Sequence, residues 1–208
     1  MDRYKTILNE ARAEQIIEKS RFIAYVKPVE TKGEADSFIA AIRAQNKSAS
    51  HNVPAMVLGE KMQTQWASDD GEPSGTAGAP IVQMLAKEGI TNIAVVVTRY
   101  FGGIKLGTGG LVRAYTSSAK LGVTAGGICR VKELAVLTLR LDYPFVNKVQ
   151  SISEREQFDI RDIDYSDAVI MKIAADPSAA GSIKSLLADI TAGTCKIVSE
   201  TEELAKVV

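Results

Sequence analysis

The stretch VTRYFGGIKLGTGGLVRAY, residues 97–115, decides the fold of the first half of the chain. It overlaps the apolar run Asn92–Thr98, which predicts a strand buried on both faces. Residues 99–110 contain five glycines, at positions 102, 103, 107, 109 and 110, and predict a glycine-rich loop. Leu111–Val123 then predict a helix. The chain thus passes from a buried strand through a glycine-rich loop into a helix.

The residues before this stretch predict an antiparallel hairpin and a helix. Alternating apolar residues in Thr6–Leu8 and Arg21–Val26 indicate the two strands of the hairpin. Gly33–Lys47 predict the helix, because apolar side chains at 35, 38, 39 and 42 have the spacing of one buried helix face. Further along we expect strands at Pro54–Gly59 and Gln63–Ala67, a polar loop over residues 68–78 and a helix at Ile81–Lys87.

The pattern changes after Gly126-Gly127. We expect a strand at 134–141, a helix at 144–157, strands at 159–165 and 168–175, a helix at 177–190 and a strand at 194–201. This βαββαβ order is the ferredoxin-like arrangement, in which two helices cover one face of an antiparallel sheet. Pro144 and Pro177 fall at the two helix starts, where a missing N–H costs nothing. The sequence therefore predicts an α+β protein with two domains, residues 1–130 and 131–208.

Charge and composition narrow the function classes. The 25 Lys and Arg residues balance 25 Asp and Glu, which argues against an unselective binder of polyanions. Residues 1–150 carry 19 basic and 14 acidic side chains, net +5, whereas residues 151–208 carry 6 and 11, net −5. Any anion-binding face is therefore expected in the first part. The first ten residues do not resemble a signal peptide and no apolar run reaches the length of a membrane span, so we expect a cytoplasmic protein without membrane contact.

Two long segments resemble the signatures of one protein family. Ser68–Gly78, with the sequence SDDGEPSGTAG, and Val97–Tyr115 closely resemble the two signature segments of the YigZ/IMPACT family. The resemblance extends to Lys19–Ile23, to His51-Asn52 and to the βαββαβ tail, and so covers nearly the whole chain. It implies a two-layer α/β N-terminal domain like the second domain of a small-subunit ribosomal protein. It also implies a ferredoxin-like C-terminal domain like the fifth domain of elongation factor G.

The resemblance implies a setting in translation, because both of these relatives act on the ribosome and eukaryotic members regulate a translation-controlling kinase. One segment departs from the family pattern. Related sequences usually have a Cys after His-Asn, whereas here His51-Asn52 is followed by Val53-Pro54. Any role that depends on that Cys is absent from this chain. The two cysteines, Cys129 and Cys195, are isolated and predict neither a disulfide nor a zinc site.

The glycine-rich loop has two interpretations. Its backbone N–H groups, with Thr108, would approach a phosphate at the start of a helix, and Arg99, Lys105 and Arg113 would complete the site. The loop fits neither GxxxxGK[ST] nor GxGxxG, which weakens a nucleotide-binding interpretation. The alternative is a turn whose glycines permit tight backbone packing.

The first signature offers two further hypotheses. Asp69, Asp70 and Glu72 have the oxygen ligands that a divalent cation requires, but the spacing of a calcium-binding EF-hand loop is absent and solvated acidic side chains are the simpler interpretation. His51, the only histidine, would form a hydrolase triad with Ser68 or Ser74 and one of the aspartates. No GxSxG elbow accompanies these residues, which favours a structural or partner-contacting histidine. We therefore expect no metal, no cofactor and no catalytic residues.

The sequence thus favours a translation-associated binding protein over an enzyme. Trp66, Tyr100 and Phe101 flank the signature loops and would stack on unpaired bases, or would belong to the core. We expect RNA, the ribosome or a ribosome-associated protein as partner, and a protein partner for the acidic C-terminal domain. A small-molecule or nucleotide-binding enzyme, kinase-like or hydrolase, is the alternative. The expected contact residues are Arg99, Tyr100, Phe101, Gly102, Gly103, Lys105, Gly107, Thr108, Gly109, Gly110, Arg113, His51, Ser68, Asp69, Asp70, Glu72, Ser74 and Thr76.

Overall fold

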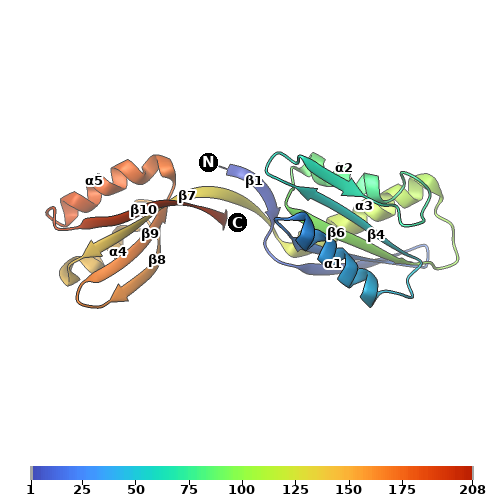
Figure 1. Cartoon of the computed structure of the whole chain (residues 1–208), viewed down its shortest axis with the longest axis horizontal. Helices are drawn as coiled ribbons and strands as arrows, with labels where there is room; N and C mark the ends of the chain where they lie inside the picture. Colours follow the sequence, from blue (N-terminus) through green and yellow to red (C-terminus); the bar gives the residue numbers. More distant parts are fainter. Residues whose placement is uncertain (1, 208) are drawn as a thin grey trace. The chain divides into compact units, whose positions relative to one another are not determined.

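The computed structural model describes residues 2–207, which fall into two compact units. The N-terminal unit comprises Arg3–Arg130 with Lys206 and Val207, and the C-terminal unit comprises Val131–Ala205 with Asp2. Each unit contains a sheet, and the described residues form five α-helices (Figure 1). The α+β class expected from the sequence is confirmed. No helix within residues 2–207 is long and apolar enough to cross a membrane.

The N-terminal unit is built on an antiparallel sheet with the strand order β2-β3-β6-β4-β5. Its elements, in chain order, are β1 (Asp2–Ile7), β2 (Ala11–Ile17), β3 (Ser20–Pro28), α1 (Lys32–Gln45), β4 (His51–Leu58), β5 (Thr64–Ala67), α2 (Gly78–Glu88), β6 (Ile93–Tyr100) and α3 (Gly107–Gly126).

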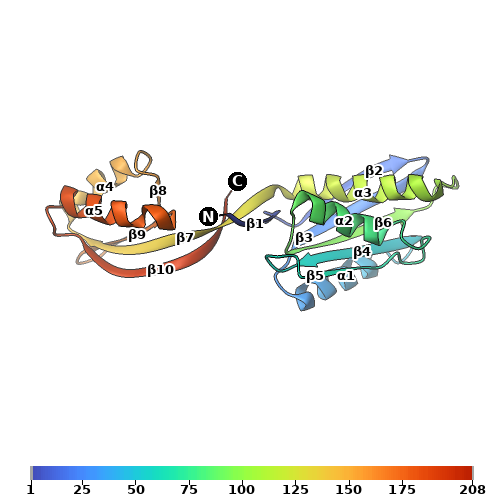
Figure 2. The same cartoon turned by 90° about the horizontal axis from the view of Figure 1, so that it is seen from above.

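Helices cover both faces of this sheet. Successive residues of β6 point to opposite faces, so that Ile93, Val95 and Val97 lie in one core and Ala94 and Val96 in another. Helices α2 and α3 pack on the first face and α1 packs on the second (Figure 2). The unit therefore has three layers, where the resemblance implied two, because the central strand is apolar on both faces.

The opening hairpin consists of β2 and β3. Glu18 and Lys19 form its turn with φ angles of 45° and 63°, the left-handed backbone that a tight two-residue hairpin turn requires. The β3 half agrees with the prediction, but the partner strand was wrongly placed at Thr6–Leu8. The true partner, β2, alternates only between exposed and half-buried residues because it lies at the sheet edge, and its pattern is correspondingly weak.

Helix α1 has both a start signal and a buried face. Thr31 Oγ1 accepts a hydrogen bond from the backbone N–H of Glu34 (3.2 Å), and Glu34 Oε2 accepts one from the N–H of Glu30 (2.8 Å). This exchange resembles a capping box. The buried residues of the helix are those of the predicted apolar face, Ala35, Phe38, Ile39 and Ile42.

The C-terminal unit has the predicted βαββαβ order. Its sheet has the strand order β1-β7-β9-β8, and β10 also pairs with β7. Side chains of the strands, such as Leu139 and Met171, pack against Val149 and Ile183 of the two helices. Its elements are β7 (Ile128–Leu141), η1 (Tyr143–Phe145), α4 (Val146–Ile152), β8 (Phe158–Tyr165), β9 (Val169–Ala175), η2 (Pro177–Ala179), α5 (Ala180–Ile190) and β10 (Lys196–Val207).

The helices of this unit are shorter than the sequence pattern indicates. Pro144 and Pro177 lie in the 3₁₀ turns η1 and η2, which precede the α-helices. Helix α4 ends at Ile152 rather than at residue 157, and the chain turns through Gln157, whose φ is 57°, into β8. A left-handed residue there cannot continue a right-handed helix.

Candidate functional site

The first signature loop, residues 68–77, is organised by the carboxylate of Asp69. Its oxygens accept hydrogen bonds from the backbone N–H groups of Gly75 (2.8 Å), Ala77 (3.1 Å) and Gly78 (2.9 Å). Because Gly78 begins α2, the carboxylate also caps that helix. Burial by itself would raise the pKa of Asp69, but the three backbone donors outweigh it and hold the pKa below its ordinary value. The Asp69 carboxylate therefore stabilises the conformation of the loop.

Asp70 ties the loop to β4 and α1. Its backbone is left-handed, with φ of 47°. One carboxylate oxygen accepts the N–H of Asn52 (2.6 Å) and the other accepts Arg43 Nη2 (2.9 Å). Its carbonyl accepts a hydrogen bond from His51 Nδ1 (2.8 Å). The histidine is thus held against the loop by the backbone of Asp70.

A buried polar cluster of Glu72, Arg99 and Tyr115 joins the two signature segments. Arg99 Nη1 and the Tyr115 hydroxyl each donate to Glu72 Oε1 at 2.7 Å. Burial, followed by the hydrogen bond to Glu72, raises the pKa of Tyr115 far above its ordinary value, so the phenol stays protonated and donates. His51 Nε2 lies 3.7 Å from the same Glu72 oxygen.

Arg99 is enclosed by aromatic rings. Its guanidinium carbon lies 5.3 Å from the ring centroids of both Phe22 and Phe101, and Nη2 donates to Ser20 Oγ (3.3 Å). Only 5% of the side chain is exposed, and Nε has no hydrogen-bond partner among residues 2–207. This burial and the ion pair with Glu72 give Arg99 a structural role. It therefore does not supply the direct phosphate contact expected from the sequence.

The metal and hydrolase hypotheses both require side chains that converge, and the acidic groups do not. Asp69, Asp70 and Glu72 each bind separate donors, and no group of three or more His, Cys, Asp or Glu side chains suited to a metal occurs in the described part of the chain. Ser68 Oγ accepts the N–H of Asp70 (3.2 Å). The ring nitrogens of His51 face Asp70 and Glu72 rather than a serine.

Close packing explains Gly102 in the second loop. A Cβ at this position would lie 2.0 Å from the carbonyl carbon and oxygen of Lys19, in the turn between β2 and β3. Ser20 Oγ accepts the N–H of Gly102 (3.1 Å) and so holds the loop in place. This glycine therefore fits the tight-packing interpretation given from the sequence.

Helix α3 begins at Gly107, not at Leu111 as predicted, so three of the loop glycines belong to its first turn. Within the described residues, Leu106 at the N-cap makes no side-chain hydrogen bond to this turn, and the first turn contains no acidic residue. The first N–H groups of a helix lack partners within it and form the positive end of its dipole. The start of α3 is thus available to an anion.

Two hollows adjoin the start of α3 and share Lys105 and Leu106 in their linings. The Phe101 pocket, of about 350 Å³, is lined by Glu72, Pro73, Arg99, Phe101, Lys105, Leu106, Gly107, Thr108 and Leu111. The Arg113 pocket, of about 460 Å³, is lined by Ile17, Glu18, Ile104, Lys105, Leu106, Gly110, Arg113, Ala114 and Ser117. Phe101 is 50% exposed, and Lys105, Thr108 and Arg113 are exposed as well.

The other predicted site residues lie apart from these hollows. Ser68 and Asp69 line a separate hollow beside Trp66. The Tyr100 hydroxyl donates to Asn46 Oδ1 (3.0 Å), Thr76 Oγ1 donates to the carbonyl of Pro73 (2.7 Å), and Ser74 and Gly103 are exposed. Two residues that the structure places in the site, Ser20 and Tyr115, were not predicted as contacts. Both lie inside the segments that carry the family resemblance, and this position was the one sequence feature that could have indicated a role in the site.

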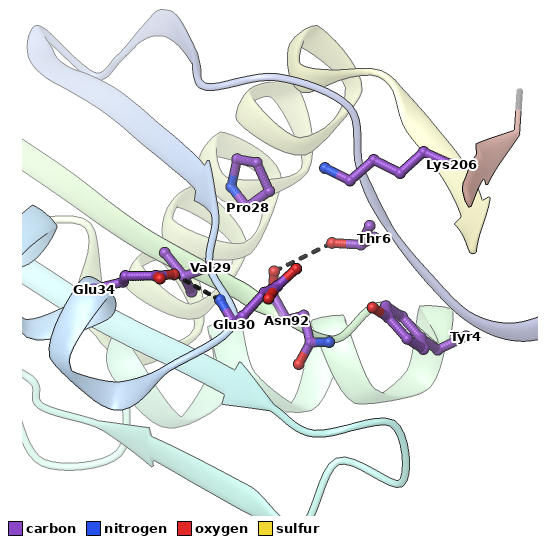
Figure 3. Close-up of a pocket in the computed structure, with 8 residues that line it drawn as sticks. All are labelled: Tyr4, Thr6, Pro28, Val29, Glu30, Glu34, Asn92 and Lys206. Carbon is purple, nitrogen blue, oxygen red and sulfur yellow. Dashed lines mark hydrogen bonds between the residues drawn. The ribbon is translucent and has the colours of Figure 1, made fainter. Parts of the chain in front are cut away.

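A further hollow of about 270 Å³ lies at the other end of the N-terminal sheet (Figure 3). Thr6 Oγ1 donates to the carbonyl of Asn92 (3.2 Å), and Glu34 accepts the N–H of Glu30 (2.8 Å). Lys206 Nζ donates to a backbone carbonyl of β1 (3.0 Å). These polar groups satisfy the backbone around the hollow, and we assign no ligand to it.

The fold and the site define a two-unit α+β protein in which a buried ionic cluster supports two adjoining surface hollows. A family model described as the Impact N-terminal domain matches residues 18–123, and a model described as a domain of unknown function (DUF1949) matches residues 139–194. The chain belongs to the IMPACT family, as its two signature segments indicated.

Relatives match over most of the chain. The IMPACT family member YvyE of Bacillus subtilis is 38% identical over 194 residues, 93% of this chain and 89% of its own length. The IMPACT family member YigZ of Escherichia coli is 32% identical over 89% of this chain and 92% of its own length. Mouse Protein IMPACT is 35% identical over 94 residues. A crystal structure described as that of a hypothetical protein covers 98% of this chain with 30% identity and a TM-score of 0.60.

Proposed function

We propose that this chain is a translation-associated binding protein and that the surface around its second signature loop contacts RNA on the ribosome. This loop surface consists of Phe101, Ile104, Lys105, Thr108 and Arg113, all of which are exposed. The observation that carries the proposal is the position of Lys105, which lines both the Phe101 pocket and the Arg113 pocket. A cation shared by two hollows suits a phosphate group of a bound nucleotide strand.

The chemistry of the loop surface suits unpaired nucleotides better than a duplex. Proteins that bind single strands combine a cationic groove with exposed aromatic rings on which bases stack. Phe101 offers such a ring, and Lys105 and Arg113 offer the cations. Glu18 also lines the Arg113 pocket, so the surface is not uniformly basic. We therefore expect weak binding that falls steeply as salt is added.

We propose a protein partner for the C-terminal unit. The exposed side chains of β8 include Asp159, Asp162 and Asp164. Arg161 on the same strand lies 3.8 Å from Asp159, but the carboxylates outnumber this cation. The strand therefore complements a basic protein surface better than it does phosphate. The RNA contact is accordingly assigned to the N-terminal unit alone.

The test is co-sedimentation with ribosomes from cell extract at low and moderate salt. The wild type is compared with Lys105→Ala/Arg113→Ala and with the matched control Lys61→Ala/Lys87→Ala, which removes the same charge at exposed positions away from both hollows. We expect the first variant to lose association and the control to keep it, with all three proteins folded. Association of the wild type with neither ribosomes nor subunits, or equal loss in both variants, would contradict the proposal.

A further inference from the structure

We propose that the Phe101 pocket binds a nucleoside 5′-phosphate, with the phosphate at the start of α3 and the base against Phe101. One source of this ligand is the 5′-phosphorylated end of an RNA strand, and for this source the inference rests on the proposed function. A free mononucleotide is the other source of the same chemistry.

The phosphate position follows from the donors at the start of α3. The helix has 20 residues, and its first N–H groups point toward an end that Leu106 leaves without a side-chain cap. Lys105 and Thr108 line the pocket beside these N–H groups. A Cβ at Gly107 would meet no described atom within 4 Å, so space for a ligand lies next to the backbone there.

The buried Arg99 side chain forms part of the pocket wall and retains one donor without a partner among the residues that the structure describes. Arg99 lines the Phe101 pocket, yet its Nε has no hydrogen-bond partner in the described chain, although only 5% of the side chain is exposed. Glu72 also lines the pocket, but its carboxylate is neutralised by Arg99 Nη1 at 2.7 Å. The net charge that the pocket presents is therefore that of Lys105.

The remaining lining suits a base and a sugar. Phe101 is half exposed, and its ring lies over the Arg99 guanidinium, which fixes the ring as a stacking surface. Pro73, Leu106 and Leu111 add apolar contacts. The volume of about 350 Å³ lies near the lower end of the range of small-molecule sites, about 300–1,000 Å³. The pocket thus fits one nucleotide rather than a longer ligand.

A terminal phosphate matches the donors better than an internal one. A phosphate monoester presents three free oxygens and up to two negative charges, whereas the phosphodiester of a chain presents two free oxygens and one charge. The N–H groups of the first helical turn, the Thr108 hydroxyl and the Lys105 ammonium are enough to bind all three oxygens. The site is therefore expected to prefer a 5′-phosphorylated nucleotide.

The experiment measures dissociation constants at one fixed low salt concentration by titration calorimetry. Three short single-stranded oligoribonucleotides of one sequence are compared: one with a 5′-phosphate, one with a 5′-hydroxyl and one with its extra phosphate at the 3′ end. Adenosine 5′-monophosphate and adenosine form a second pair. We expect the 5′-phosphate to tighten binding about tenfold, as one additional charge-assisted hydrogen bond would, and the 3′-phosphate to have little effect.

The variant Thr108→Val removes one hydroxyl and keeps the backbone donors. We expect it to reduce the preference for the 5′-phosphate severalfold, by weakening the 5′-phosphorylated oligonucleotide more than the 5′-hydroxyl one. Equal binding of all three oligonucleotides with no binding of the monophosphate would overturn the inference and leave the proposed RNA contact standing. Binding of the monophosphate without any oligonucleotide would support the inference, with a free nucleotide as source, and contradict the RNA contact. Binding of none of the ligands would contradict both.

Discussion

Glu72 Oε1 lies 2.7 Å from Arg99 Nη1, and the two side chains are only 4% and 5% exposed. The pair joins the first signature loop to the end of β6, and the same oxygen accepts the Tyr115 hydroxyl from α3. Three segments that are distant in the sequence therefore meet at one carboxylate. Since Glu72 and Arg99 also line the Phe101 pocket, the ion pair determines the shape of the pocket as well as the stability of the unit.

Glu72→Gln is expected to destabilise the protein strongly. The substitution keeps the side-chain volume but leaves the buried Arg99 charge without compensation, which typically costs about 3–5 kcal/mol. Glu88→Gln is the control, because Glu88 pairs with Lys120 on the surface at 2.9 Å and such pairs contribute about 1 kcal/mol or less. Urea unfolding of both variants is the measurement. A similar small loss in each would show that Glu72 does not compensate Arg99 as described.

Tyr115→Phe is expected to remove a dependence of stability on pH in the alkaline range. The raised pKa keeps the phenol protonated in the folded protein, whereas in the unfolded chain it ionises near pH 10. The unfolded state therefore binds fewer protons above about pH 10, and the free energy of unfolding of the wild type falls there as pH rises. Unfolding curves between pH 8 and pH 11 should show a shallower decline for the variant. Identical slopes would contradict the burial of the phenol and its hydrogen bond to Glu72.

Asp69→Ala is expected to destabilise the loop and α2 at neutral pH by about 1–2 kcal/mol, the effect of losing a helix cap. The lowered pKa favours the ionised carboxylate in the folded state. Its contribution is therefore complete above the unfolded pKa, near 3.9, and is lost as pH falls through the lower folded value. Thermal unfolding from pH 7 to pH 3 should show the difference between variant and wild type shrinking below about pH 4. A difference that stays constant over this range would argue against the carboxylate cap.

Gly102→Ala is expected to disturb the second loop, because the new Cβ would overlap the backbone of Lys19. Overpacking of this kind costs about 1–3 kcal/mol. Gly181→Ala, in α5, is the matched control: a Cβ there would meet no described atom within 4 Å, and we expect a gain of about 0.5–1 kcal/mol. Denaturant unfolding distinguishes the two. A neutral effect of Gly102→Ala would mean that the loop and the β2–β3 turn do not pack as closely as described.

The elements with strong apolar periodicity were predictable from the sequence. The buried face of α1, the central strand β6 and the βαββαβ order of the second unit follow from side-chain spacing alone. The edge strand β2 and the early start of α3 could not be predicted from side-chain spacing. An edge strand alternates only weakly, and the helical turn at Gly107–Gly110 contains three glycines, which are poor helix formers on their own.

The candidate site was predictable in its parts but not in its arrangement. The glycine-rich loop and its cations were recognised as a potential anion site, and the structure places Lys105 and Thr108 beside one pocket. The burial of Arg99 and its pairing with Glu72 depend on contacts between residues 27 positions apart in the chain. No local pattern reports such a contact, so an exposed phosphate-binding arginine and a buried structural one have the same appearance in the sequence.

The most direct test of the central claim is the salt dependence of affinity for a short single-stranded RNA. Each phosphate contact contributes about −0.7 to the slope of log K against log salt concentration for single strands. We predict that Lys105→Ala/Arg113→Ala makes the slope less steep by about 1.4, the value for two lost contacts, while Lys61→Ala/Lys87→Ala leaves it unchanged. A slope that is the same in the wild type and in both variants would contradict the assignment of the loop surface as the RNA contact.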